Sequence, residues 1–192
     1  MENNTTVRQP KKPCESCNKP VAGFESVNLG SMEKGYRHLC MACYNATMSE
    51  YSGVDFEHAD FEPIRLADVD GVEHEFHFAT QLTGDRVAID AREVKDGEPT
   101  GGYEFQVIGF EPEGEILELF GKLLEKMRRA LSRKHLEERE LGVGIADHHT
   151  VRARIDCDLD SEDNFGDRRP LVVIDGKPIT WDQFGHMMMT RL

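Results

Sequence analysis

The sequence lacks any long apolar run: no stretch approaches the roughly 18–20 consecutive apolar residues that a membrane-spanning helix needs. Its first segment, MENNTTVRQPKKP, lacks the apolar core of a secretory signal. The HExxH motif, the nucleophile elbow and the phosphate-binding glycine loop are absent as well. These absences predict a cytoplasmic protein without a membrane partner, and they leave no catalytic residue to nominate.

Basic residues are scarce, since 23 Lys and Arg stand against 36 Asp and Glu and the net charge is −13. Residues 1–50 hold six basic and five acidic residues, a balance of +1, which leaves −14 for residues 51–192. Nucleic-acid binding depends on neutralising phosphates with Lys and Arg. The acidic charge therefore disfavours nucleic acid as a partner of the larger part of the chain.

Cysteine is also rare, but four of the five cysteines form two CxxC pairs, Cys14 with Cys17 and Cys40 with Cys43. In a reducing compartment such pairs are more often metal sites than disulfides. Two pairs supply the four thiolates of a tetrahedral zinc site, and a shell closed by protein ligands is structural rather than catalytic. We therefore expect one structural zinc ion per chain within a module over residues 12–51.

The segments around the cysteines predict a hairpin over residues 24–39 and a helix over residues 41–51. The apolar face of that helix is expected to carry Tyr44, Met48 and Tyr51. The stretch HLCMACYN resembles the second half of ZZ-type fingers, and the whole module resembles treble-clef fingers, including the small zinc domain of bacterial Clp unfoldases. That resemblance implies a zinc-stabilised module and no particular function, because treble clefs serve many roles.

The rest of the chain predicts an α+β domain over residues 67–192, preceded by a flexible arm (1–11), the zinc module (12–51) and a linker (52–66). Expected strands cover residues 72–82, 86–94, 103–110, 151–157 and 171–174. A long helix is expected over residues 113–136, and Thr180 with Gln183 predicts a capping box that opens a final helix. We expect Ile155 and Cys157 to face the core and Trp181 to anchor the last helix there.

The phrases EVKDGEPTGG and ITWDQFG resemble an uncharacterised bacterial protein family. No activity is known for that family, so the resemblance implies a fold unit and nothing about chemistry.

Histidine clusters are the remaining candidates for chemistry. His74 and His77 are three apart on one expected strand, which places them on opposite faces. Asp147, His148 and His149 could form a second metal or acid–base site, although adjacent loop histidines are more often solvated.

The long helix carries a basic stripe that could hold an acidic partner or phosphate. However, Glu118 and Glu125 lie four residues before two of its members, in the order that favours pairs within the helix. The stripe comprises Lys122, Lys126, Arg129 and Arg133.

Three functions remain open. The first is a zinc-binding adaptor or regulatory protein that engages a protein partner or a second copy of itself. The second is a nucleic-acid-binding regulator, and the third is a metal-dependent enzyme built on Asp147, His148 and His149. The nucleic-acid regulator would use the basic residues Arg8, Lys11, Lys12, Lys19, Lys34 and Arg37.

Overall fold

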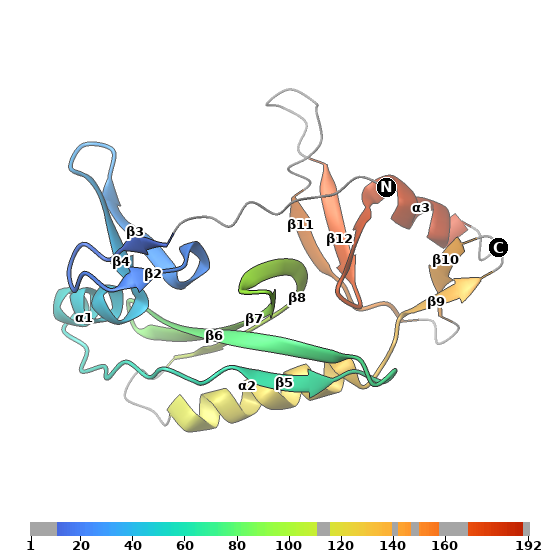
Figure 1. The fold of residues 1–192 in the computed structure, drawn as a ribbon, viewed down its shortest axis with the longest axis horizontal. Helices are drawn as coiled ribbons and strands as arrows, with labels where there is room; N and C mark the ends of the chain where they lie inside the picture. Colours follow the sequence, from blue (N-terminus) through green and yellow to red (C-terminus); the bar gives the residue numbers. More distant parts are fainter. Residues whose placement is uncertain (1–10, 111–115, 140–141, 147–149, 158–168, 190–192) are drawn as a thin grey trace.

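Three hydrophobic cores follow one another along the chain. Figure 1 shows the elements around them, coloured in sequence order. The computed structural model describes residues 11–110, 116–139, 142–146, 150–157 and 169–189. Every strand pairing within these residues is antiparallel, and the helices pack against the sheets. The fold is α+β, as the sequence predicts.

The first core lies in the four-cysteine module, which we define as residues 12–53. It is made by Val21, Leu39 and Tyr44 together with Cys14, all of them buried. The helix ends at Gly53, whose φ of 68° suits the left-handed cap that glycine provides. The elements are β1 (Lys12–Pro13), β2 (Pro20–Val21), η1 (Gly23–Glu25), β3 (Ser26–Ser31), β4 (Gly35–Cys40) and α1 (Met41–Ser52).

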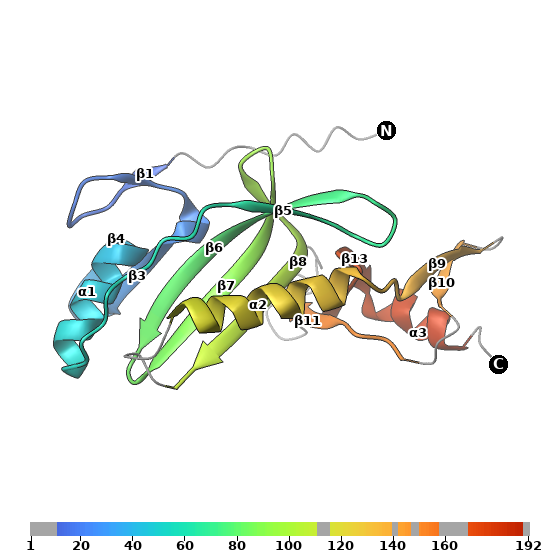
Figure 2. The same ribbon diagram turned by 90° about the horizontal axis from the view of Figure 1, so that it is seen from below.

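The second core lies between a four-stranded sheet, ordered β5-β6-β7-β8, and a helix on one of its faces (Figure 2). Buried Leu123, Met127 and Leu131 fall on one side of that helix at a spacing of four. Phe61, in the linker and extended entry segment expected over residues 52–66, stacks on Phe120 with ring centroids 3.9 Å apart. The elements are β5 (Ile64–Ala67), β6 (Glu73–Thr83), β7 (Arg86–Lys95), β8 (Glu98–Gly109) and α2 (Ile116–Leu131).

The third core lies near the C-terminal end of the chain and is made by Leu136, Val172, Ile174 and Ile179. The expected capping box is confirmed: the backbone N–H of Gln183 donates to Thr180 Oγ1 (3.3 Å), and that of Thr180 donates to Gln183 Oε1 (3.1 Å). The elements are β9 (Leu136–Arg139), β10 (Gly142–Ile145), β11 (Arg154–Cys157), β12 (Pro170–Ile174), β13 (Lys177–Thr180) and α3 (Trp181–Met189).

The four-cysteine module is fixed to the sheet by Asn45, which is 1% exposed. Its side-chain Nδ2 donates to the backbone oxygen of Thr80 (2.7 Å), and its Oδ1 accepts from the backbone N–H of Leu82 (2.9 Å). Strand β5 pairs with β6 only between Glu73 and Phe76, so this part of β6 would otherwise be an open edge. The amide of Asn45 thus takes the place of a neighbouring strand.

A second contact lies over the polar face of the sheet. The guanidinium of Arg92 donates to the backbone oxygen of Phe24 (3.1 Å), and the rings of Phe24 and His77 meet edge to face at 6.2 Å. The two contacts hold the module at two points of the sheet, one on its edge and one on its face.

The turn between β12 and β13 joins the third core to the sheet. Asp175 has a φ of 49°, and its Oδ2 accepts the backbone N–H groups of His135 (2.6 Å) and Leu136 (2.7 Å). Gly176, with a φ of 71°, packs against Tyr103, and a Cβ at this position would lie 2.9 Å from the tyrosine ring. Only glycine satisfies both the backbone angle and the close approach.

We expect Gly176→Ala to destabilise the chain by about 3 kcal/mol, from left-handed strain and collision with the ring together. Gly97→Ala is the matched control, because Gly97 also has a positive φ (83°) but nothing lies within 4 Å of its missing Cβ. Urea unfolding of both variants measures the difference. Equal losses would show that the contact with Tyr103 contributes nothing.

Four expectations about single elements are wrong. The helix expected to reach residue 136 ends at Leu131, and Leu136 instead begins β9. Tyr51, Ile155 and Trp181, all expected to be apolar contacts, are 86%, 72% and 49% exposed. Within the residues that the structure describes, no helix is long and apolar enough to cross a membrane.

Candidate metal centre

The first CxxC pair lies in a tight turn that follows β1. The backbone N–H of Asn18 donates to the oxygen of Cys14 (2.8 Å), and the N–H of Cys14 donates to the oxygen of Lys19 (2.8 Å). Asn18 adopts a φ of 62°, a left-handed conformation that asparagine tolerates better than most residues. This turn curls Cys14 and Cys17 toward one point.

The second pair lies where β4 leads into α1. Cys40 is the N-cap residue of the helix, and Cys43 lies in its first turn. The N–H groups and the positive end of the helix dipole favour negative charge at this position. The hairpin and the helix start therefore carry the second pair to the first.

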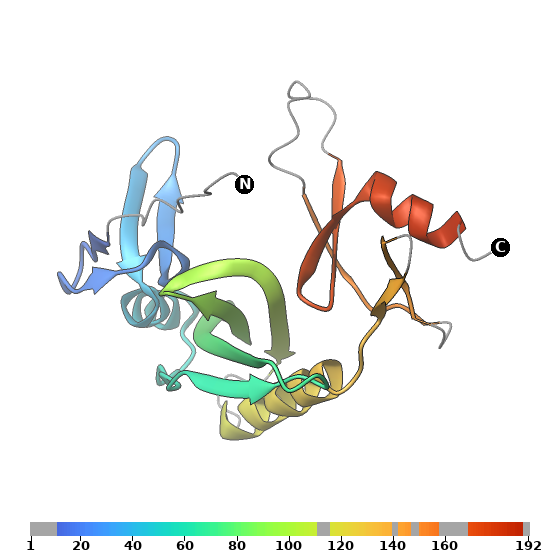
Figure 3. The ribbon, with the colours of Figure 1, turned by 45° about the vertical axis from the view of Figure 1, so that its right-hand side comes forward.

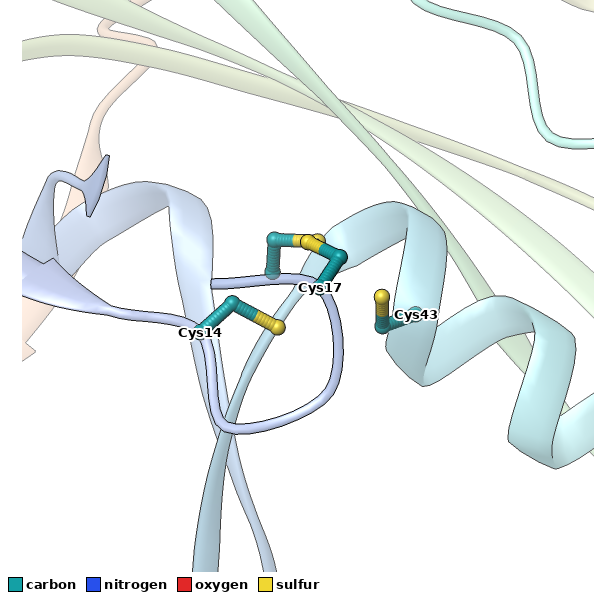
Figure 4. Close-up of side chains that lie close together, drawn as sticks. Cys14, Cys17 and Cys43 are labelled. Carbon is teal, nitrogen blue, oxygen red and sulfur yellow. The ribbon is translucent and has the colours of Figure 1, made fainter. Parts of the chain in front are cut away.

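The four sulfurs form one cluster, with all Sγ atoms within 4.8 Å of one another. Figure 4 shows Cys14, Cys17 and Cys43 directed toward a common centre from the turn and from α1. The Sγ atoms of Cys17 and Cys40 are 3.7 Å apart, and all four cysteines are free thiols rather than disulfides. Sulfurs about 2.3 Å from a central ion at tetrahedral angles are about 3.8 Å apart, so the cluster fits a tetrahedral metal ion.

The cluster's electrostatics also fit a cation. Burial opposes ionisation of Cys14, but hydrogen bonds from backbone groups, those of Cys17 and Cys40 foremost, outweigh it and lower its pKa to about 6. Burial, assisted by the neighbouring thiols, raises the pKa of Cys40 to about 12 and also raises the pKa of Cys43. At neutral pH Cys14 therefore favours the thiolate, whereas Cys40 and Cys43 favour the thiol, and a bound cation would stabilise their thiolates with release of protons.

The histidines that the sequence offered as candidates do not form a second metal site among the described residues. His74 and His77 lie on opposite faces, as expected: His74 Nδ1 is 2.7 Å from Glu93 Oε1, whereas His77 Nδ1 is 3.7 Å from Glu25 Oε1. In the described part of the chain, the four cysteines are the only group of three or more such residues placed to hold a metal ion. Asp147, His148 and His149, the possible second site, lie outside the described residues.

Asn45 is the residue that the sequence analysis missed. It lies two positions after Cys43 on the same helix, and its Nδ2 is also 2.7 Å from Nδ1 of His58. A polar residue beside apolar Tyr44 in a short helix was the one sequence feature that could have indicated this role. The backbone groups that Asn45 binds in β6 lie 35 and 37 positions away along the chain. The metal cluster and the contact with the sheet therefore share one short helix.

Three family models match the chain, each described only as a domain of unknown function. They are the Domain of unknown function (DUF7685) over residues 13–55, (DUF7686) over residues 57–132 and (DUF7713) over residues 135–191. Neither a curated protein nor a solved structure matches the chain. Each span contains one of the three hydrophobic cores, while the domain boundaries expected from the sequence stay a prediction.

Proposed function

We propose that this chain is a zinc-binding adaptor or regulatory protein whose four-cysteine module and α+β body engage a protein partner. The observation that carries the proposal is a closed four-sulfur site supporting a hairpin whose tip exposes large apolar side chains. Met32 is 93% exposed and Tyr36 is 58% exposed. Figures 1 and 3 show the β3–β4 hairpin extending away from the sheet.

Zinc is the metal that the donor set favours. Four thiolates in a tetrahedral arrangement suit Zn²⁺, which takes this geometry in structural sites. Four protein ligands leave no position for water or substrate, which supports a structural role for the ion. The order of turn, hairpin, second cysteine pair and helix supports a treble-clef-like finger.

The hairpin tip has the properties of a contact surface. Methionine and tyrosine are both enriched at protein interfaces, where methionine adapts to different shapes and tyrosine combines an apolar ring with a polar end. The opposite side of the module is occupied by its contacts with the sheet through Asn45 and Phe24. The tip is thus an apolar face of the module that these contacts leave free for a partner.

Exchange of both tip residues, Met32→Ser with Tyr36→Ser, is expected to reduce the amount of captured partner at least tenfold, about 1.4 kcal/mol or more. The metal-loaded full chain serves as bait in an extract of the cells that produce it. Mass spectrometry then quantifies the captured protein. Val69→Ser is the control, because Val69 is similarly exposed (57%) on the turn between β5 and β6. Equal capture by all three proteins would contradict the proposal.

A nucleic-acid role remains the alternative, since the module exposes several cations. Nuclease treatment before capture separates the two: a complex held by nucleic acid disappears, and one held by protein contacts persists. Salt is a second discriminator, because phosphate contacts weaken steeply as salt rises. The exposed cations are Lys11, Lys12, Lys19, Lys34 and Arg37, while Arg8 lies outside the described residues.

A further inference from the structure

Strand β8 has an open edge. It is the last strand of its sheet and pairs only with β7 in the part of the chain that the structure describes. Successive residues of a strand direct their backbone groups to alternate sides. The oxygen of Gln106 points to the open edge, because Lys126 donates to it. Glu104 lies two residues before Gln106 in the same regular register with β7, so its backbone N–H and C=O face that edge as well.

A groove of about 1040 Å³ runs along this edge and is lined by residues 102–106. Helix α2 forms one wall with Lys122, Lys126 and Arg129, and the chain around β11 forms the other with Arg152 and Arg154. Figure 2 shows α2 crossing in front of β7 and β8, with β11 near the C-terminal end of α2.

The groove is basic in an acidic protein. Its lining contains six Lys and Arg against four Asp and Glu, whereas the whole chain carries −13. Two of these cations have only weak partners: Lys122 pairs with Glu118, and Arg129 pairs with Glu125, on an exposed helix surface. Such exposed pairs contribute about 0–1 kcal/mol, so an incoming carboxylate can replace them.

Arg154 adds an unsatisfied donor at one end of the groove. Its Nη2 donates to the backbone oxygens of Gly101 (3.1 Å) and Gly102 (3.3 Å). Its Nε–H is buried, and no acceptor among the described residues bonds to it. Nη1 of the same guanidinium lies 2.6 Å from Asp156 and 3.5 Å from Glu104, so an acidic ligand would compete with these carboxylates for Arg154 and could satisfy its Nε–H as well.

We propose that this groove binds an extended acidic segment of a partner protein, which adds as a strand to the edge of β8. This inference rests on the proposed function as a protein-binding adaptor and names the partner's chemistry. Backbone N–H groups of the partner would replace Lys126 at Gln106 and pair with Glu104, while side-chain carboxylates meet the freed cations on both walls. A peptide backbone offers these alternating donors and acceptors, whereas a phosphate backbone offers acceptors alone.

The test uses the metal-loaded full chain and a fluorescent ten-residue peptide in which two glutamates alternate with one valine, so that carboxylates face both walls of the groove. We expect binding by fluorescence polarisation, with slower amide hydrogen exchange over residues 102–106. Lys126→Glu with Arg129→Glu should weaken binding by about tenfold or more. Lys95→Glu with Lys177→Glu makes the same change in net charge outside the groove and should alter binding by less than about twofold.

Two further probes keep the inference falsifiable even if the groove variants fold poorly. The same peptide with alternate amides N-methylated keeps its charge but loses strand pairing, and it should not bind the unchanged protein. An oligothymidylate of ten nucleotides should not displace the peptide.

Absence of peptide binding, equal binding of the methylated peptide, or displacement by the oligonucleotide would each overturn the inference. Unchanged binding by well-folded groove variants would overturn it too. A partner whose binding requires Met32 and Tyr36 but not Lys126 and Arg129 would also overturn this inference. The proposed function would then still stand.

Discussion

Replacing Cys40 by serine is expected to abolish metal binding and unfold the four-cysteine module. A serine hydroxyl is a poor substitute for a thiolate at a zinc site, and three thiolates leave the tetrahedral shell open to water. The module's own core holds only Cys14, Val21, Leu39 and Tyr44 as buried residues. Modules of about 40 residues rarely stay folded on so small a core, whereas structural zinc contributes about 10–16 kcal/mol to folding.

Elemental analysis of the purified chain gives the metal content, and hydrogen exchange over residues 26–52 reports the folding of the module. We expect one zinc ion per chain in the unchanged protein and none in Cys40→Ser. Cys157→Ser is the matched control, because the fifth cysteine lies in β11 and belongs to no metal cluster among the described residues. Full metal content and unchanged exchange in Cys40→Ser would refute the assignment of the site.

Replacing Asn45 by alanine is expected to destabilise the full metal-loaded chain by about 3 kcal/mol. The change leaves the backbone oxygen of Thr80 and the N–H of Leu82 buried without their partners, and each such group costs about 1–3 kcal/mol. The stability of Asn45→Asp should lie between that of Asn45→Ala and that of the unchanged protein. Its carboxylate still accepts from the backbone N–H of Leu82 but repels the backbone oxygen of Thr80.

Urea unfolding measures the free energy, and amide exchange at Leu82 shows whether the edge of β6 has opened. Asn28→Ala is the control within the same module, since the side chain of Asn28 bonds to His38 on an exposed hairpin (3.3 Å). A loss for Asn45→Ala no greater than that for Asn28→Ala would show that this bridge does not hold the module to the sheet.

Features set by neighbouring residues were predictable from the sequence. The CxxC spacing brought the four cysteines together, and the alternation of residues 72–94 predicted β6 and β7 within one or two residues. The pair Thr180 and Gln183 predicted the start of α3, because a capping box is completed within four positions. Each of these signals acts over a short stretch of chain.

Features set by distant parts of the chain were not predictable. Ile155 lies at an alternating position that is typical of a core residue. However, β11 is an edge strand, and Ile155 is 72% exposed. Leu136 continues the apolar spacing of α2, yet Asp175 binds the backbone at residues 135 and 136 and begins a strand there instead. In both cases the tertiary surroundings of the residue, rather than the local sequence pattern, determined its structure.

The docking of Asn45 also couples the cysteine cluster to an edge of the sheet. The residue lies on the helix whose first turn carries Cys43, and its side chain covers residues 80–82 of β6. An uncovered strand edge pairs readily with other chains. A chain whose module unfolds would therefore expose this edge, and we expect it to aggregate more readily than the intact protein.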